Sequence, residues 1–162
     1  MPLAYLCHTN TITMSFFNFF KKKPLQNPQK TVLPDLPALN AWGIFFQQGN
    51  FNLYSRFAGS LPGESANTIY LKSYPELPQL ERVHYADWLY IAFNGIFLQR
   101  WDSADGSLTS LIFVDVDKVS IKEVKTNIYS NNWSAYMQGE ALVFTFNGDA
   151  KEVVTVTLAD LK

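Results

Sequence analysis

The chain has 162 residues, and its 13 basic and 14 acidic side chains give a formal net charge of −1. This length fits one domain, and a near-neutral charge disfavours binding to nucleic acid, which needs clustered Lys and Arg. Hydrophobic residues make up 48% of the sequence, enough for a core that needs no disulfide or metal to stabilise it. The single cysteine, Cys7, cannot form an internal disulfide. A chain without disulfides suits a reducing compartment, so we expect the cytoplasm.

Residues 1–34 are expected to form a flexible segment ahead of the folded domain. Residues 1–13 lack the basic region and the continuous apolar run of a secretory signal, so we expect Met14 to be the true start. Residues 21–37 contain four prolines among Lys, Gln and Asn. This composition favours an extended tether over a helix.

An aromatic and basic stretch within this segment is a candidate membrane contact. Its residues are Phe16, Phe17, Phe19, Phe20, Lys21, Lys22 and Lys23. The phenylalanines would enter the membrane interface and the lysines would meet anionic headgroups, at about 1 kcal/mol per lysine. The alternatives are a free terminus, or one that folds back and covers the core with its phenylalanines.

The folded domain is expected to span residues 35–162 and to begin with a helix. Apolar residues recur at steps of three and four over residues 36–48, which predicts a short amphipathic helix capped by Asp35 and ended by Gly49. From residue 67 onward the apolar period changes to two, which predicts strands. The expected strands are 68–73, 88–93, 96–101, 108–116, 119–126, 141–146 and 153–158.

Turn residues join these segments into hairpins. Asn94-Gly95 and Asn147-Gly148 each separate two alternating runs, the strongest short hairpin signal, and Asp105-Gly106 marks a further turn. We therefore predict a mainly β (α+β) fold with about seven antiparallel strands in meander order. The strands would close as a barrel or sandwich, with one or two short helices N-terminal to them.

Several of these elements are similar to a known family. They are Leu61-Pro62-Gly63-Glu64 ahead of the first strand, the hairpin at 94–98, the strand pair within 113–124 and the late hairpin within 142–156. On these residues the chain from Leu61 to Lys162 resembles bacterial pleckstrin-homology-like domains of the GRAM type. The resemblance implies a lipid- or protein-binding barrel without catalytic activity. That family closes its barrel with a C-terminal helix, a place that the expected 36–48 helix would have to take here.

No residue pattern predicts a catalytic or metal site, and we expect no cofactor. Glu81 and His84 have the spacing of a carboxylate–histidine metal pair, but the chain offers no second copy of it. His84 and Asp87 would be the residues of an enzyme, yet no nucleophile elbow accompanies them. Asp115 and Asp117 share a strand face beside a turn, where a solvated edge is the simpler interpretation. An enzyme is therefore the least favoured reading.

The segment 127–139 is the candidate binding site. It carries no charge, is too long for a tight hairpin loop, and mixes aromatic side chains with Ser and Asn. Such mixtures suit protein recognition, because Tyr and Trp give large rigid contacts and the small polar residues give adaptable hydrogen bonds. The candidate residues are Tyr129, Asn131, Asn132, Trp133 and Tyr136. The alternative is a further strand with Trp133 and Tyr136 packed on the core.

The sequence thus predicts a non-catalytic binding module whose partner is another protein. A membrane-lipid-binding module is the first alternative, on the strength of the N-terminal stretch and the family likeness. A toxin-neutralising immunity protein is another, although no residue pattern identifies a toxin. Discriminating among them needs the structure of the surface.

Overall fold

The computed structural model describes residues 29–32, 41–61, 67–130, 132–147 and 152–162. The described residues form strands and two short 3-10 helices, so the predicted mainly β fold is confirmed. The strands are β1 (Gln29–Val32), β2 (Gly43–Gln48), β3 (Phe51–Ser60), β4 (Asn67–Tyr74), β5 (His84–Ala92), β6 (Gly95–Trp101), β7 (Thr109–Asp115), β8 (Ser120–Ile128), β9 (Asn132–Gln138), β10 (Ala141–Asn147) and β11 (Glu152–Val156). The 3-10 helices are η1 (Pro78–Leu80) and η2 (Leu158–Leu161).

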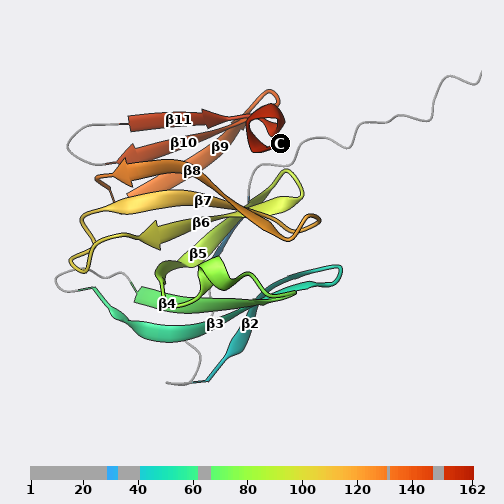
Figure 1. Ribbon diagram of the computed structural model, residues 1–162. Coiled ribbons are helices and arrows are strands. Elements are labelled where there is room, and N and C mark those ends of the chain that lie inside the picture. Colours follow the sequence, from blue (N-terminus) through green and yellow to red (C-terminus); the bar gives the residue numbers. More distant parts are fainter. Residues whose placement is uncertain (1–28, 33–40, 62–66, 131, 148–151) are drawn as a thin grey trace, which may run out of the picture.

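The strands pair in two antiparallel sheets that stack in three layers. One sheet runs in meander order from β2 to β8, and the second has the order β11-β10-β9. In Figure 1 the β2–β4 part lies at the bottom, β5–β8 form the middle layer, and β9–β11 lie on top. Among the described strands no pairing joins β8 back to β2, so the predicted meander is stacked as in a sandwich.

The centre of the middle layer, strands β6 and β7, is buried on both faces. Alternate residues of β6 and β7 face opposite sides, and nearly all of both strands are buried. Phe97 and Phe113 belong to the upper core, beneath β9–β11, whereas Ile96 and Ile112 belong to the lower core, above β2–β4. The outer faces of β2–β4 and β9–β11, together with much of β8, are what remains for solvent or for a partner.

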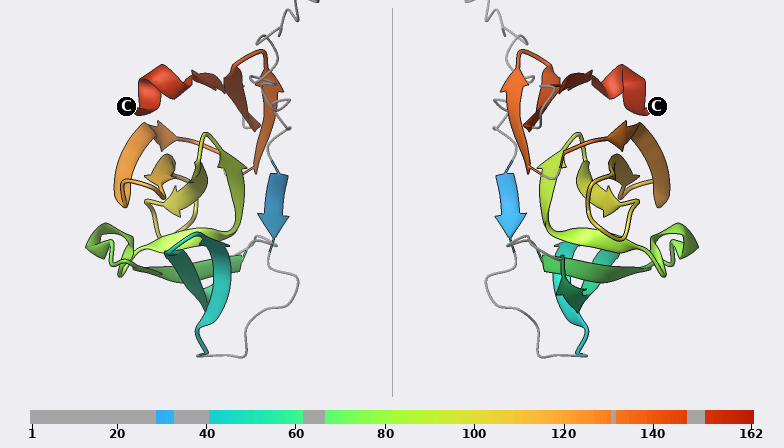
Figure 2. Two further views of the ribbon diagram at one scale, coloured as in Figure 1. Left: turned by 90° about the vertical axis from the view of Figure 1, so that its right-hand side faces the viewer. Right: turned by 90° about the vertical axis from the view of Figure 1, so that its left-hand side faces the viewer.

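Strand β5 links the lower and middle layers by changing its partner along its length. Its first part pairs with β4 at Ala86, and the part from Trp88 to Ile91 pairs with β1 instead. Figure 2 shows β1 beside β5. Residues 29–32 are therefore paired in a sheet, although they fall in the segment predicted to be flexible. The Phe and Lys residues of the candidate membrane contact lie outside the described residues.

The hairpin predicted at Asn94-Gly95 is present, but its turn lies one residue earlier. Ala92 pairs with Gly95, so the two turn residues are Phe93 and Asn94, with φ of 55° and 57°. Two successive positive φ values are typical of the type I′ turn that suits the twist of a hairpin. Gly95 is needed for another reason, because a Cβ there would lie 2.4 Å from the ring of Phe113.

The predicted helix over residues 36–48 is wrong for its described part. Residues 43–48 form strand β2, and residues 36–40 lie outside the described ranges. A register shift between Ile44 and Phe46 interrupts the pairing of β2 with β3. Such a bulge breaks the two-residue period, so that adjacent apolar residues in a strand imitate the spacing of a helix.

The turn predicted at Asp105-Gly106 is confirmed, since Gly106 has a φ of +75° and donates to Ser103. The late hairpin pairs Leu142 with Val156, as the alternation predicted. Residues 148–151, which include Gly148, lie outside the described residues.

Candidate functional site

A cleft of about 450 Å³ opens on the outer face of the lower layer. Its lining residues are Trp42, Arg56, Tyr70, Leu71, Lys72, Glu81 and Arg82. They come from the start of β2, from β3 and β4, and from the segment between η1 and β5. A volume of this size is in the range of small-ligand and side-chain pockets.

The register of the strands builds the floor of the cleft. Arg56 on β3 stands opposite Tyr70 on β4, and the pairing of Gly43 with Ser55 places Trp42 on the other side of Arg56. The Arg56 guanidinium carbon lies 5.3 Å from the ring centroids of both Trp42 and Tyr70. A guanidinium between two aromatic rings is held by their π faces, so the cation is positioned without a counter-ion.

Lys72 repeats this arrangement one step along the sheet. Its Nζ lies 4.5 Å from the Trp42 ring centroid and 5.8 Å from that of Tyr54, which is its cross-strand neighbour. Trp42 therefore contacts two cations at once. The row ends at His84, whose Nε2 is 2.9 Å from the Tyr70 hydroxyl and whose ring centroid is 4.8 Å from that of Tyr70.

The three cations of the cleft lack the partners that four other described cations have. Arg100, Lys118 and Lys125 each form an ion pair with a carboxylate, and Lys122 donates to the backbone oxygen of Asp160. Within the described part of the chain, none of the cleft cations Arg56, Lys72 and Arg82 has a carboxylate within ion-pair distance. The one acid among the described lining residues is Glu81. Among its described lining residues the cleft thus has an excess of positive charge, on a protein whose net charge is −1.

Two local features set the cleft apart from an ordinary sheet surface. Arg82 has a φ of 60°, a left-handed conformation that few residues other than Gly, Asn and Asp adopt. The Nε of Arg56 is buried and has no hydrogen-bond partner among the described atoms. Backbone strain and unsatisfied donors concentrate at sites where a structure is arranged for a ligand.

Exposed apolar side chains surround the cleft. Trp42, Ile44 and Tyr74 have exposed fractions of 38%, 60% and 66%. Tyr74 follows Tyr70 and Lys72 on the same face of β4, where every second residue points away from the core. We call this surface the β2–β4 face and define it by Trp42, Ile44, Tyr54, Arg56, Tyr70, Lys72 and Tyr74.

The segment 127–139, the binding site predicted from the sequence, is not an open loop. Residues 132–138 form β9, and Trp133 is 4% exposed. Its ring packs on Phe146 at 4.8 Å and on Trp88 at 5.5 Å, and its Nε1 donates to the Ser130 oxygen at 3.0 Å. The alternative, a further strand with Trp133 packed on the core, is therefore confirmed for Trp133, and its prediction as a surface contact is wrong.

The other predicted contacts of this segment are dispersed. Tyr129 and Tyr136 are 76% and 49% exposed, but Tyr129 follows β8 whereas Tyr136 lies within β9. Asn132 is exposed at the start of β9 and Asn131 lies outside the described residues. Without Trp133 these side chains have no central anchor of the kind that binding sites use.

The side chains considered for catalysis have structural partners. His84 contacts Tyr70, and Asp87 accepts a hydrogen bond from Asn67 at 3.2 Å. Asp115 accepts the backbone N–H groups of Asp117 and Lys118, so it closes the turn after β7. Burial of Asp115 acts to raise its pKa, but these hydrogen bonds and the Lys118 ammonium outweigh it and lower the pKa. Across the described residues, no three His, Cys, Asp or Glu side chains gather as a metal site would require.

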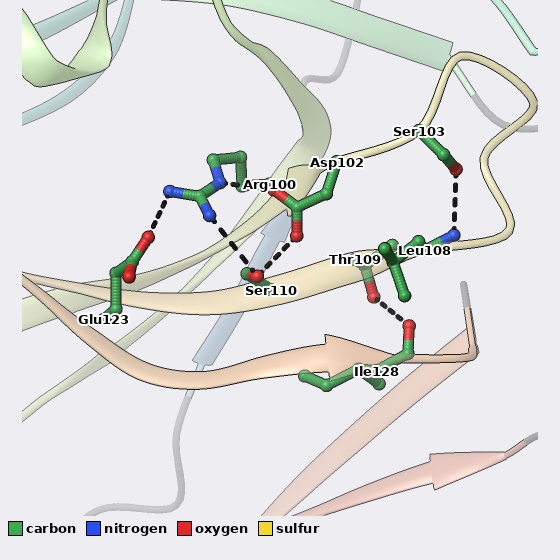
Figure 3. A network of polar contacts seen from close by, with 8 residues as sticks. All are labelled: Arg100, Asp102, Ser103, Leu108, Thr109, Ser110, Glu123 and Ile128. Atoms are coloured by element: carbon green, nitrogen blue, oxygen red, sulfur yellow. Dashed lines mark hydrogen bonds and ion pairs between the residues drawn. The ribbon is translucent and has the colours of Figure 1, made fainter.

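A second polar cluster joins β6, β7 and β8, and it is closed on itself (Figure 3). Arg100 donates to Asp102 and to Glu123, each at 2.6 Å, and Ser110 donates to the other oxygen of Asp102. Burial acts to lower the Arg100 pKa, but these two carboxylates outweigh it and raise it. Each charge in this cluster has an opposite charge beside it. It therefore holds three strands together, with its charges neutralised within the cluster.

A further hollow of about 500 Å³ lies among the loops that follow β2, β4 and β7. Its lining residues are Gln48, Gly49, Asn50, Phe51, Pro75, Val116, Asp117 and Val119. They include one charged side chain, Asp117, and no aromatic side chain at the surface, since Phe51 belongs to the lower core. The hollow lacks the convergence of charge and aromatic rings that marks the cleft.

Comparisons of the chain with protein-family models, with curated proteins and with solved structures found no match. Within the described ranges, no helix has the length and apolar character needed to cross a membrane.

Proposed function

We propose that this protein is a non-catalytic binding module and that it docks another protein on the β2–β4 face. The observation that carries the proposal is the arrangement around Trp42, which is exposed yet contacts two cations, Arg56 and Lys72, that have no ion-pair partner among the described residues. Aromatic residues and Arg are the side chains that dominate binding energy at protein interfaces. The single cysteine supports a cytoplasmic setting for this role.

The geometry of the face supports docking of a macromolecule over entry of a small substrate. Four of the seven described lining residues of the cleft are exposed, and the apolar side chains beside it extend the surface beyond one pocket. Exposed apolar side chains around a polar centre are typical of an interaction surface. The pairing of His84 with Tyr70 and of Asp87 with Asn67 supports a role without catalysis.

Quantitative capture of partners from a native lysate tests this proposal. The double variant Trp42→Ala with Ile44→Ser should lose the bound protein and keep its melting temperature within a few degrees, because both side chains are exposed. Tyr129→Ala with Tyr136→Ala is the matched control, since it removes two exposed tyrosines that lie outside the β2–β4 face. Equal capture by both double variants would contradict the assignment of the β2–β4 face.

Binding of membrane lipid is the second candidate, favoured by the same uncompensated cations. Anionic headgroups attract such cations by about 1 kcal/mol each near a membrane surface. Sedimentation with vesicles that contain phosphatidylserine would show it. Sedimentation that Lys72→Gln abolishes would replace a protein partner by a lipid surface.

A further inference from the structure

We infer that the cleft receives carboxylate side chains, so that the partner presents an acidic segment to the β2–β4 face. This inference rests on the proposed function and adds the chemistry of the ligand. Its basis is the contrast between the three cleft cations, which have no ion-pair partner among the described residues, and Arg100, Lys118 and Lys125, which each pair with a carboxylate.

The charge of the cleft calls for an anion. Arg56, Lys72 and Arg82 line it together with the single acid Glu81. Charge complementarity of this kind selects the partner and speeds the encounter. Because Lys72 is exposed and Arg56 is only partly buried, an incoming carboxylate reaches them without a large desolvation penalty.

The hydrogen-bond donors are held in advance. Trp42 and Tyr70 fix the guanidinium of Arg56 from both sides, and Trp42 also lies beside the Lys72 ammonium. A planar guanidinium that is already oriented loses less entropy when it binds a carboxylate. The buried Nε of Arg56 is a donor that still lacks an acceptor among the described residues.

Isolated carboxylates fit the cleft better than a continuous polyanion does. Glu81 would repel a chain of phosphates that follows the wall of the cleft, and the protein as a whole is negatively charged. An acidic peptide can place its carboxylates on the cations and leave a neutral residue beside Glu81. The apolar rim of Ile44 and Tyr74 then covers the methylene groups of the acidic side chains.

The experiment compares two short synthetic peptides, one of alternating Glu and Ser and one of alternating Gln and Ser. Binding to the full chain is measured by calorimetry at about 50 mM salt, where screening is weak. The Glu peptide should bind at least about tenfold more tightly than the Gln peptide, and Lys72→Gln should weaken it about fivefold or more. Lys125→Gln is the matched control, because Lys125 already pairs with Glu152 at 2.7 Å on another face.

The other outcomes overturn the inference. Equal affinity for the two peptides, or equal loss in Lys72→Gln and Lys125→Gln, would show that carboxylates are not recognised in the cleft. Tighter binding of a single-stranded oligonucleotide or of phosphatidylserine vesicles, with the same dependence on Lys72, would assign the cations to phosphate. If the acidic peptide does not bind but capture of a protein from lysate still depends on Trp42, the β2–β4 face remains the docking surface and only its acidic ligand is refuted.

Discussion

Replacing Trp133 by Ala should destabilise the protein by about 4 kcal/mol, since removal of a buried Trp typically costs 3–5 kcal/mol. The structure places the value well inside this range. The ring is 4% exposed and lies against Phe146, Trp88 and Phe144, with centroid distances of 4.8, 5.5 and 6.5 Å. Aromatic pairs of this geometry add about 0.5–1.5 kcal/mol beyond burial.

The hydrogen bond of Trp133 makes a smaller contribution. Its Nε1 donates to the Ser130 oxygen at 3.0 Å, but that oxygen also accepts the Thr109 hydroxyl at 2.8 Å. The oxygen is therefore not left unsatisfied in the variant, and the loss should stay near 1 kcal/mol. Urea denaturation followed by circular dichroism measures the total. Tyr136→Ala on the same strand, where the side chain is 49% exposed, should cost less than about 1 kcal/mol. A Trp133→Ala variant as stable as Tyr136→Ala would refute the packing of β9–β11 on the middle layer.

Gly95→Val should destabilise the protein by about 2–3 kcal/mol in thermal unfolding, because its Cβ would lie 2.4 Å from the Val114 backbone oxygen, which cannot move aside. Asn94→Gly, at a φ of 57°, should be nearly neutral. A larger loss of stability in Asn94→Gly than in Gly95→Val would instead place the turn at Asn94-Gly95. Burial raises the pKa of Tyr85 to about 12. The folded state therefore holds the Tyr85 proton more tightly than the unfolded state, and stability is lost as pH rises from about 10 to about 12. Tyr85→Phe should remove this loss when stability is measured by denaturant titration across that pH range. A dependence of stability on pH like that of the parent would contradict the burial of Tyr85. For Asp115, whose folded pKa is lowered, the contribution is present above about pH 4 and is lost as pH falls through the folded pKa. Asp115→Ala should flatten the acid limb of the stability profile, and an acid limb like that of the parent would show that the turn does not depend on this carboxylate.

Much of the fold could be predicted because a strand with one buried face shows an alternation of apolar and polar residues in its sequence. Residues 68–73 and the hairpin joining β5 and β6 were predicted in this way. Strand β2 could not be predicted in this way. The register shift between Ile44 and Phe46 leaves three successive apolar residues, which hides the alternation that identifies a strand. The environment of Trp133 could not be predicted either, because its neighbours in the sequence are Ser and Asn whereas its neighbour in the fold is Phe146.

The cleft was not predicted, because its residues come from four separate segments. Only the register of β2, β3 and β4 brings Trp42, Arg56 and Tyr70 into one row. One signal was nevertheless present in the sequence. Tyr54-x-Arg56 and Tyr70-x-Lys72 repeat an aromatic and a cation at a two-residue interval, which places both pairs on one face of adjacent strands. That repeat would have favoured this surface over the segment 127–139.

The most direct test of the β2–β4 face is site-specific photo-crosslinking in a native lysate. A benzoylphenylalanine replaces Ile44 in one variant and Tyr136 in the other, two exposed positions on opposite outer layers with exposed fractions of 60% and 49%. A protein adduct should form from position 44, become weaker when Lys72→Gln is added, and be absent from position 136. A protein adduct from position 136 alone would contradict the docking face and return the site to β9–β11.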